Sequence, residues 1–170
     1  MLEKRTGDAT REDDVRAALD GIDAVILTLG LPKTAAAFLR PVRLFSDATA
    51  VLAPAMAAAG VRRLLAVTGF GTGDSYARLS SLERIGFQAI LGRAYADKNL
   101  QERLITETDL DWTLVRPGVL TSNRMTGRYQ VLTEPSTWRN GMISRADVAH
   151  FLIHAAEDGT FLREAPVLVR

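Results

Sequence analysis

Short runs of consecutive apolar residues, separated by longer stretches with helical periodicity, give this chain its pattern. The first run, residues 23–30, reads DAVILTLG; it starts from an acidic residue and ends on a glycine. Two more follow at residues 63–68 (RLLAVT) and 111–116 (DWTLVR), the second stopped by Pro117 and Gly118. Because nearly unbroken apolar runs of this length are typical of strands covered on both faces, all three predict strands of a parallel sheet.

Apolar positions in the intervening stretches recur about every three or four residues, which predicts helices. Two of them open with the spacing of a capping box, residues 10–13 and 144–147, and two end at a glycine, Gly21 and Gly60. The expected helices cover residues 11–20, 41–59 with a kink at Pro54, a long region ending in 93–107, and a stretch that follows Ser144. Strands alternating with helices predict an α/β fold, a Rossmann-like parallel sheet flanked by helices.

Composition narrows the class of protein. With 170 residues, 47% hydrophobic side chains and a net charge of +1, we expect one soluble globular domain. Its 21 basic and 20 acidic residues are interspersed, which leaves no basic face for nucleic acid, and the absence of cysteine excludes disulfides and thiolate sites. The longest apolar stretch, residues 48–61, is shorter than a membrane span of about 20 residues. Residues 1–5 are charged and lead into no apolar segment, so we expect a cytoplasmic protein without a membrane partner.

What precedes the first strand is unusual for a nucleotide-binding sheet. The first 22 residues contain no G-x-G-x-x-G or G-x-x-G-x-x-G phosphate loop, and residues 1–6 (MLEKRT) are too polar for a buried strand. Residues 1–170 therefore read as a single Rossmann-like domain, truncated at its amino terminus and lacking the first β-α-β unit. Two explanations stay open: the protein has further residues upstream, or the chain is a degenerate paralogue.

Six segments then match one family in the same order. They are residues 7–9 (GDA), 23–30, 60–68 (GVRRLLAVT), the helix around Lys98, 110–118 (LDWTLVRPG) and 142–151 (MISRADVAHF). Together they resemble the atypical short-chain dehydrogenases of the NAD(P)H-binding, NmrA-like group, most closely the biliverdin-IXβ/flavin reductase branch. The resemblance implies NADPH or NADH as the cofactor, with a slight preference for NADPH, and a small-molecule substrate.

The resemblance also implies which residues bind the cofactor. Asp8 would accept a hydrogen bond from the adenine amino group, and a side chain at Gly30 would block the close approach of the cofactor. Each residue alone also has a structural interpretation, such as a turn at Asp8 or a strand end at Gly30. From the adenine to the nicotinamide, the implied residues are Asp8, Ala9, Leu29, Gly30, Thr68, Lys98, Pro117, Gly118 and Val119.

Three residues are candidates for catalysis: Lys98, Thr68 and Tyr95. Only three of the 21 basic residues are lysines, and one of them stands at the family's lysine position. From a helix beside the nicotinamide, Lys98 can bond the ribose hydroxyls and lower the pKa of a proton donor; alternatively it is a solvated residue paired with Glu102. Tyr95 lies one residue short of the Y-x-x-x-K spacing, so we favour a packing role for it.

Two further patterns allow more than one interpretation. Residues 68–73 (TGFGTG) form a glycine-rich loop after a strand, which would either cradle a phosphate or face the substrate, and we favour the substrate. Within this loop, Gly69 stands where the biliverdin reductase branch carries a serine. His150 and His154 lie one helical turn apart, but without further convergent ligands we expect no metal site.

The leading hypothesis is an NAD(P)H-dependent oxidoreductase that transfers hydride to a flavin, a quinone or a similar small conjugated acceptor. The alternative is a non-catalytic NmrA-like module that senses a dinucleotide weakly or binds a protein. Without the missing unit, strand 23–29 has a free edge that no lysine or proline protects. We therefore expect a homodimer through this edge, or an edge covered by residues 1–10.

Overall fold

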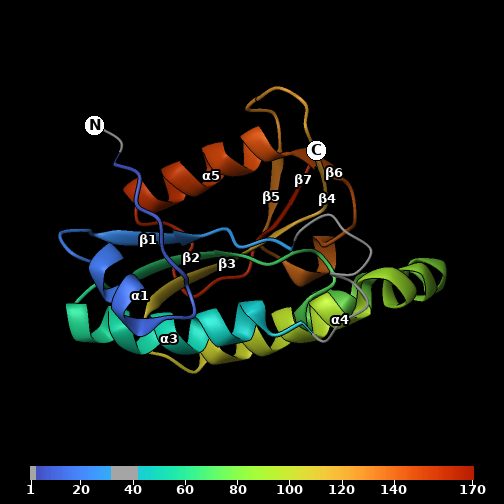
Figure 1. The fold of residues 1–170 in the computed structure, drawn as a ribbon. Coiled ribbons are helices and arrows are strands. Elements are labelled where there is room, and N and C mark those ends of the chain that lie inside the picture. Colours follow the sequence, from blue (N-terminus) through green and yellow to red (C-terminus); the bar gives the residue numbers. More distant parts are fainter. Residues whose placement is uncertain (1–2, 32–41) are drawn as a thin grey trace.

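The computed structural model of the protein describes residues 3–31 and 42–170. Its main sheet has five strands in the order β1-β2-β3-β7-β5 (Figure 1). The first four are parallel and β5 is antiparallel to β7. A separate pair, β4 (Val119–Thr121) and β6 (Met142–Ser144), is also parallel. The strands of the main sheet are β1 (Ala24–Leu27), β2 (Arg63–Val67), β3 (Asp111–Pro117), β7 (Val167–Val169) and β5 (Gln130–Leu132).

Helices cover both faces of this sheet, as Figure 1 shows. On one face lie α1 (Glu12–Ala18), α3 (Leu44–Ala59) and α4 (Ser81–Thr106); α5 (Arg145–Glu157) lies on the other. Successive residues of β2 belong to the apolar cores on opposite faces of the sheet. Leu64 packs with α1 and α3, whereas Leu65 packs with α5. Two 3-10 helices, η1 (Gly73–Arg78) and η2 (Pro135–Thr137), lie in the connections. The predicted architecture, a mainly parallel Rossmann-like sheet flanked by helices, is confirmed.

The structure differs from the sequence prediction at the start of two helices. The capping box expected at residues 10–13 is absent, because the Thr10 hydroxyl instead donates to Asp8 Oδ1 at 2.7 Å, and α1 begins after Arg11 without a side-chain cap. The described part of the second helix begins at Leu44, and the predicted start at Pro41 lies outside the described residues. That helix continues across Pro54 and ends at Gly60, whose φ of 74° is the left-handed value expected of a terminating glycine.

Helix α4 is held against α3 by a buried side chain. Asp97, on α4, accepts hydrogen bonds from the backbone amides of Phe45 at 2.9 Å and Ser46 at 3.4 Å. These amides belong to the first turn of α3, where N–H groups have no partner within the helix. The contact fixes the part of α4 that carries Lys98. In the described chain, no helix is long and apolar enough to cross a membrane.

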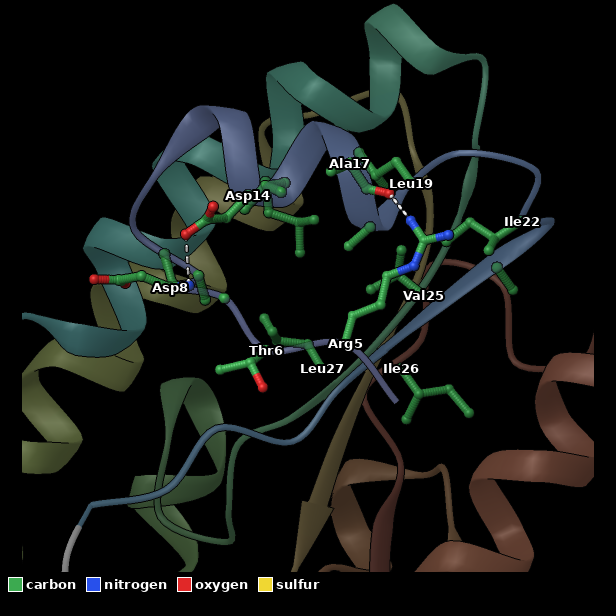
Figure 2. A pocket seen from close by; sticks show the side chains of 17 residues that line it. Arg5, Thr6, Asp8, Asp14, Ala17, Leu19, Ile22, Val25, Ile26 and Leu27 are labelled. Carbon is green, nitrogen blue, oxygen red and sulfur yellow. Dashed lines mark hydrogen bonds between the residues drawn. The ribbon is translucent and has the colours of Figure 1, made fainter. Parts of the chain in front are cut away.

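A groove of about 460 Å³ lies beside the outer edge of β1. It is bounded by β1, by α1 and by the chain around Asp8 (Figure 2). This segment binds α1 rather than β1, since the Asp8 amide donates to Asp14 Oδ2 at 2.9 Å and the Arg5 guanidinium donates to the Ala17 carbonyl. Among the described strands, β1 pairs only with β2, so residues 3–10 form no strand pairing with its other edge.

Candidate functional site

A cleft of about 340 Å³ opens at the carboxyl ends of β2 and β3. Open parallel sheets bind ligands outside this end of their strands. The structure brings together here a catalytic candidate from α4, the last residue of the β2 run and the turn after β3. The lining residues are Thr68, Gly69, Phe70, Leu79, Leu91, Tyr95, Pro117, Gly118, Val119, Leu120, Asn140 and Arg145.

Lys98 lies at the same end of β2, although it is not among the residues that line the cleft. Its ammonium donates to the Val67 carbonyl at 3.1 Å and stands 4.1 Å from the centre of the Phe45 ring. Burial lowers the pKa of Lys98 to about 8, although the charges of Glu102 and Asp97 act in the opposite direction. Lys98 is therefore not a solvated residue, and the alternative in which it simply pairs with Glu102 is wrong.

Glu102 is instead the centre of a buried polar network. Arg116 donates to its two carboxylate oxygens, from Nε at 3.1 Å and from Nη2 at 2.7 Å, and reaches Asp74 with Nη1 at 2.6 Å. The Thr68 hydroxyl donates to Glu102 Oε1 at 2.6 Å, and the Thr72 hydroxyl has two possible acceptors, the same oxygen at 2.6 Å and the Gly69 carbonyl at 2.8 Å. Because the single hydroxyl proton of Thr68 is used in this bond, Thr68 has none to donate to a substrate in this arrangement.

The glycine-rich loop does not present its backbone to an anion. Four successive N–H groups donate within the protein: Phe70 to the Pro117 carbonyl, Gly71 to Ser75 Oγ, Thr72 to the Gly69 carbonyl and Gly73 to Asn99 Oδ1. A phosphate cradle needs such groups unpaired and convergent. The amides of residues 70–73 are therefore already used within the protein, and the phosphate-cradle interpretation is wrong. Of these four residues, Phe70 lines the cleft.

Tyr95 explains why the loop carries a glycine after Thr68. A Cβ atom at Gly69 would collide with the Tyr95 hydroxyl and would lie 3.1 Å from Tyr95 Cζ. The serine of the biliverdin reductase branch would not fit here without movement of the tyrosine. Burial raises the pKa of Tyr95 to about 12, and the charge of Glu102 adds to this effect. Tyr95 therefore both packs on the loop and presents a protonated hydroxyl beside the cleft.

Gly118 also owes its identity to packing. A Cβ at this position would run into the carbonyl oxygen of Gly141, and the Val119 amide donates to the same oxygen at 2.8 Å. The turn after β3 is thus held against the start of β6. Pro117, Gly118 and Val119 line the cleft in this fixed position.

The residues implied for the adenine end lie elsewhere. Asp8 and Ala9 line the groove beside β1, where Figure 2 shows Asp8 next to Asp14. Hydrogen bonds from Thr10 lower the pKa of Asp8, first from its amide and then from its hydroxyl. At the end of the β1 run, a Cβ on Gly30 would meet no atom of the described residues within 4 Å.

The pyrophosphate of a dinucleotide finds no equivalent place among the described residues. A phosphate is normally bound by the N–H groups of a helix N-terminus and by its positive dipole end. All four described α-helices carry acidic side chains at this end: Glu12, Asp13 and Asp14 on α1, Asp47 and the capping Asp97 on α3, Glu83 on α4 and Asp147 on α5. The described chain therefore fits the nicotinamide end of the cofactor better than its phosphates.

The two histidines of α5 are engaged with each other and with Tyr129. Their rings stack at 4.2 Å, and His150 Nδ1 lies 2.9 Å from the Tyr129 hydroxyl. Within residues 3–31 and 42–170, no group of three or more His, Cys, Asp or Glu side chains is arranged to hold a metal ion.

Sequence reasoning missed several cleft and network residues. Asn140 and Arg145 come from segments whose proximity to β2 depends on the fold. The sequence does indicate a structural role for Arg116, because an arginine that ends an otherwise apolar strand requires a buried partner. It indicates Glu102, the partner, only as a neighbour of Lys98 on the helix surface.

Comparisons with known proteins point to one family. The model of a family described as NAD(P)H-binding matches residues 2–159. The curated "Uncharacterized sugar epimerase YhfK" of Bacillus subtilis is 25% identical over 146 residues, which are 86% of this chain and 62% of that protein. The chain thus spans less than two thirds of this relative.

Solved structures with the same fold include reductases. ChuY of Escherichia coli O157:H7, described as an anaerobillin reductase, is 26% identical with a TM-score of 0.78, covering 96% of this chain and 72% of ChuY. ChuY of E. coli CFT073 is 27% identical with the same TM-score, over 97% and 75% of the two chains. A short-chain dehydrogenase/reductase of Veillonella parvula in complex with NADP, 15% identical with a TM-score of 0.78 over 96% and 70%, shares the fold.

The buried charge of Lys98 should lower stability at neutral pH. Its pKa falls from 10.5 to about 8 on folding. The protonated lysine therefore costs stability below pH 8, the free energy of unfolding rises as pH increases from 8 to 10.5, and the cost is absent above that range. We expect Lys98→Met to raise the free energy of unfolding by about 1 to 3 kcal/mol at about pH 7 and by little at about pH 10, as measured by urea denaturation. Lys4→Met, at an exposed lysine, is the control; equal stabilities of Lys98→Met and wild type at neutral pH would contradict this assignment.

The acidic helix N-termini predict weak binding of the whole cofactor. In fluorescence titrations of residues 1–170, we expect NADPH to show no saturation below about 1 mM, because nothing in the described chain receives its pyrophosphate. Reduced nicotinamide mononucleotide, which lacks the pyrophosphate and adenylate, should bind within about threefold of NADPH. Micromolar binding of NADPH with a large preference over the mononucleotide would show that other groups hold the phosphates.

Proposed function

The chain belongs to the NAD(P)H-binding family, and we propose that it is an oxidoreductase that transfers hydride to a flavin, a quinone or a similar small conjugated acceptor. The observation that carries this proposal is the position of Lys98. Its ammonium is fixed at the carboxyl end of β2 by the Val67 carbonyl, beside a cleft with largely apolar walls. A cation at this position can bind ribose hydroxyls while an acceptor occupies the cleft.

The residues around the cleft take the following roles. A bound reduced nicotinamide supplies the hydride. Lys98 donates hydrogen bonds to the ribose hydroxyls, the turn at Pro117, Gly118 and Val119 lies along the nicotinamide amide, and Gly30 leaves room for the cofactor. Thr68 acts through Glu102 rather than on the substrate. Leu29, Asp8 and Ala9 complete the cofactor side, with Asp8 and Ala9 at the adenine.

The acceptor side of the cleft suits a planar, conjugated molecule. Phe70, Leu79, Leu91 and Leu120 contribute apolar surface. The pKa of the Tyr95 hydroxyl is raised, so this group stays protonated at neutral pH and does not act as a strong acid. An extended conjugated ring accepts hydride without a strong protein acid. We take NADPH as the preferred cofactor on the family resemblance alone.

A non-catalytic module is the second candidate. It is favoured by the acidic helix N-termini and by the paired N–H groups of residues 70–73, which together weaken the binding of a dinucleotide. Turnover separates the two candidates. An oxidoreductase consumes the reduced nicotinamide in proportion to the acceptor, whereas a sensing module binds it and leaves it unchanged.

Two substitutions on α4 test the assigned roles. We expect Lys98→Ala to lower kcat/KM for NADPH by about 10- to 100-fold, since a charged hydrogen bond is worth about 1.5 to 3 kcal/mol. Tyr95→Phe should change kcat/KM by about twofold or less. The assay is the loss of reduced-nicotinamide absorbance with FMN or a quinone as acceptor.

Lys4→Ala is the matched control, because Lys4 is exposed and remote in sequence from the cleft. A large loss of kcat/KM in Tyr95→Phe with Lys98→Ala near wild type would reverse the two roles. Binding of reduced nicotinamide mononucleotide without turnover on any acceptor would favour the non-catalytic module.

We also propose that the chain forms a homodimer through the free edge of β1. This edge borders an apolar groove, and the side chain of Ile26 remains 40% exposed. At about 100 µM we expect light scattering to report a dimer, and Ile26→Lys to give a monomer because a lysine on an edge strand opposes pairing. Ile153→Lys, at an equally exposed isoleucine on α5, should leave the dimer intact. A monomeric wild type under these conditions would contradict the proposal.

A further inference from the structure

Glu102 connects four parts of the protein that meet at the cleft. Its carboxylate is only 4% exposed, and both of its oxygens accept hydrogen bonds. It joins α4 to the end of β2 through Thr68, to the glycine-rich loop through Thr72 and to β3 through Arg116. A carboxylate with this many donors is fixed in one position, and it fixes its partners in turn.

The network continues to the cleft wall through an aromatic side chain. The Arg116 guanidinium lies 5.3 Å from the centre of the Trp138 ring, and the Trp138 indole N–H donates to the Leu132 carbonyl at 3.0 Å. Trp138 packs in one buried cluster with Phe70 and Leu79. Phe70 and Leu79 both line the cleft, so Arg116 is linked through Trp138 to the apolar wall of the cleft.

The negative charge of Glu102 also acts on both candidate catalytic side chains of α4. It raises the pKa of Lys98 against the opposing effect of burial, and it raises the pKa of Tyr95 in the same direction as burial. In each case the carboxylate favours the protonated form. Around Lys98, the groups that face its ammonium are Asp97 and Glu102 on α4, the Phe45 ring on α3 and the Val67 carbonyl on β2.

We propose that Glu102 is a positioning residue of this site: through its two oxygens it holds the glycine-rich loop and Arg116 in place. Lys98 lies four residues before Glu102 on α4, within range of the same carboxylate, whose charge favours its ammonium form. Glu102 does not touch the cleft itself, since it is absent from the residues that line it. The consequence for catalysis rests on the proposed function, whereas the effects of Glu102 on the loop and on Lys98 are independent of it.

The packing of Gly73 shows how close the loop comes to this network. A Cβ at Gly73 would lie 2.5 Å from Arg116 Nη2 and 2.8 Å from Glu102 Oε2. Its φ of 52° also lies in the left-handed region, which disfavours any other residue. The loop therefore lies directly on the ion pair, with a glycine where no side chain has room.

Protonation of Lys98 is measured without any activity. The chain has three lysines, Lys4, Lys33 and Lys98, so pH-dependent acetylation followed by mass spectrometry resolves each one, with exposed Lys4 as the internal reference. In Glu102→Gln, we expect the labelling midpoint of Lys98 to fall by about one pH unit, because the carboxylate charge that favours the ammonium is lost. Glu107→Gln makes the same chemical change at an exposed position at the end of α4 and should leave the midpoint unchanged.

The loop is tested separately by hydrogen exchange. Thr72→Val removes the hydroxyl that contacts Glu102 and the Gly69 carbonyl, and it keeps the charge of Glu102. We expect exchange of the Gly71 and Gly73 amides to accelerate by about tenfold, while the labelling midpoint of Lys98 stays within about 0.2 pH unit of wild type. If Glu102→Gln fails to fold, Thr72→Val still tests the positioning role of Glu102.

The results that would overturn the proposal are distinct from those that concern the reaction. A folded Glu102→Gln with the Lys98 midpoint of wild type, or a folded Thr72→Val with loop exchange unchanged, overturns the positioning role whatever the turnover. Absence of turnover in the wild type contradicts the proposed function and leaves both measurements valid. Where turnover is present, the alkaline limb of the pH profile should move to lower pH in Glu102→Gln together with the Lys98 midpoint.

Discussion

The buried ion pair between Glu102 and Arg116 is the interaction on which the candidate site depends. Removing one partner of such a pair leaves an unpaired charge in the interior and typically costs about 3 to 5 kcal/mol. Here the pair also connects a helix to two strand ends and to a loop. The arrangement of these strand ends and of the loop therefore depends on a contact between residues 14 positions apart in sequence. The parallel sheet determines where the strand ends lie, and this ion pair determines how the side chains are arranged at one end of the sheet.

The sequence predicted the elements whose cause is local. Residues 63–68 and 111–116 were recognisable because an apolar run buried on both faces has one pattern in any context. The three-residue strands β4, β5, β6 and β7 were not, since strands this short are defined by their partners. The capping box at residues 10–13 failed for a related reason: Asp8 competed for the Thr10 hydroxyl.

The candidate site was predicted in part, for a similar reason. Thr68, Tyr95 and the turn at Pro117 end strands or face them, so the rule for parallel sheets places them together. What each of these side chains contacts could not be predicted from the sequence, because the fold decides which residues meet. The sequence TGFGTG is compatible with a phosphate cradle, and only the hydrogen-bond partners of its amides show that those of residues 70–73 are already used within the protein.

Gly69 and Tyr95 occupy a single space at the cleft, and this limits how the protein can change over evolutionary time. A side chain at position 69 collides with the tyrosine hydroxyl, so a serine there is compatible only with a smaller residue at position 95 or with a displaced ring. Substitution at either position alone passes through a clash or an unfilled gap beside the loop. Across related proteins the two positions should therefore vary as a pair. A short hydroxyl carried by the loop and a long one carried by the helix are then two mutually exclusive ways to place one polar group at the same point.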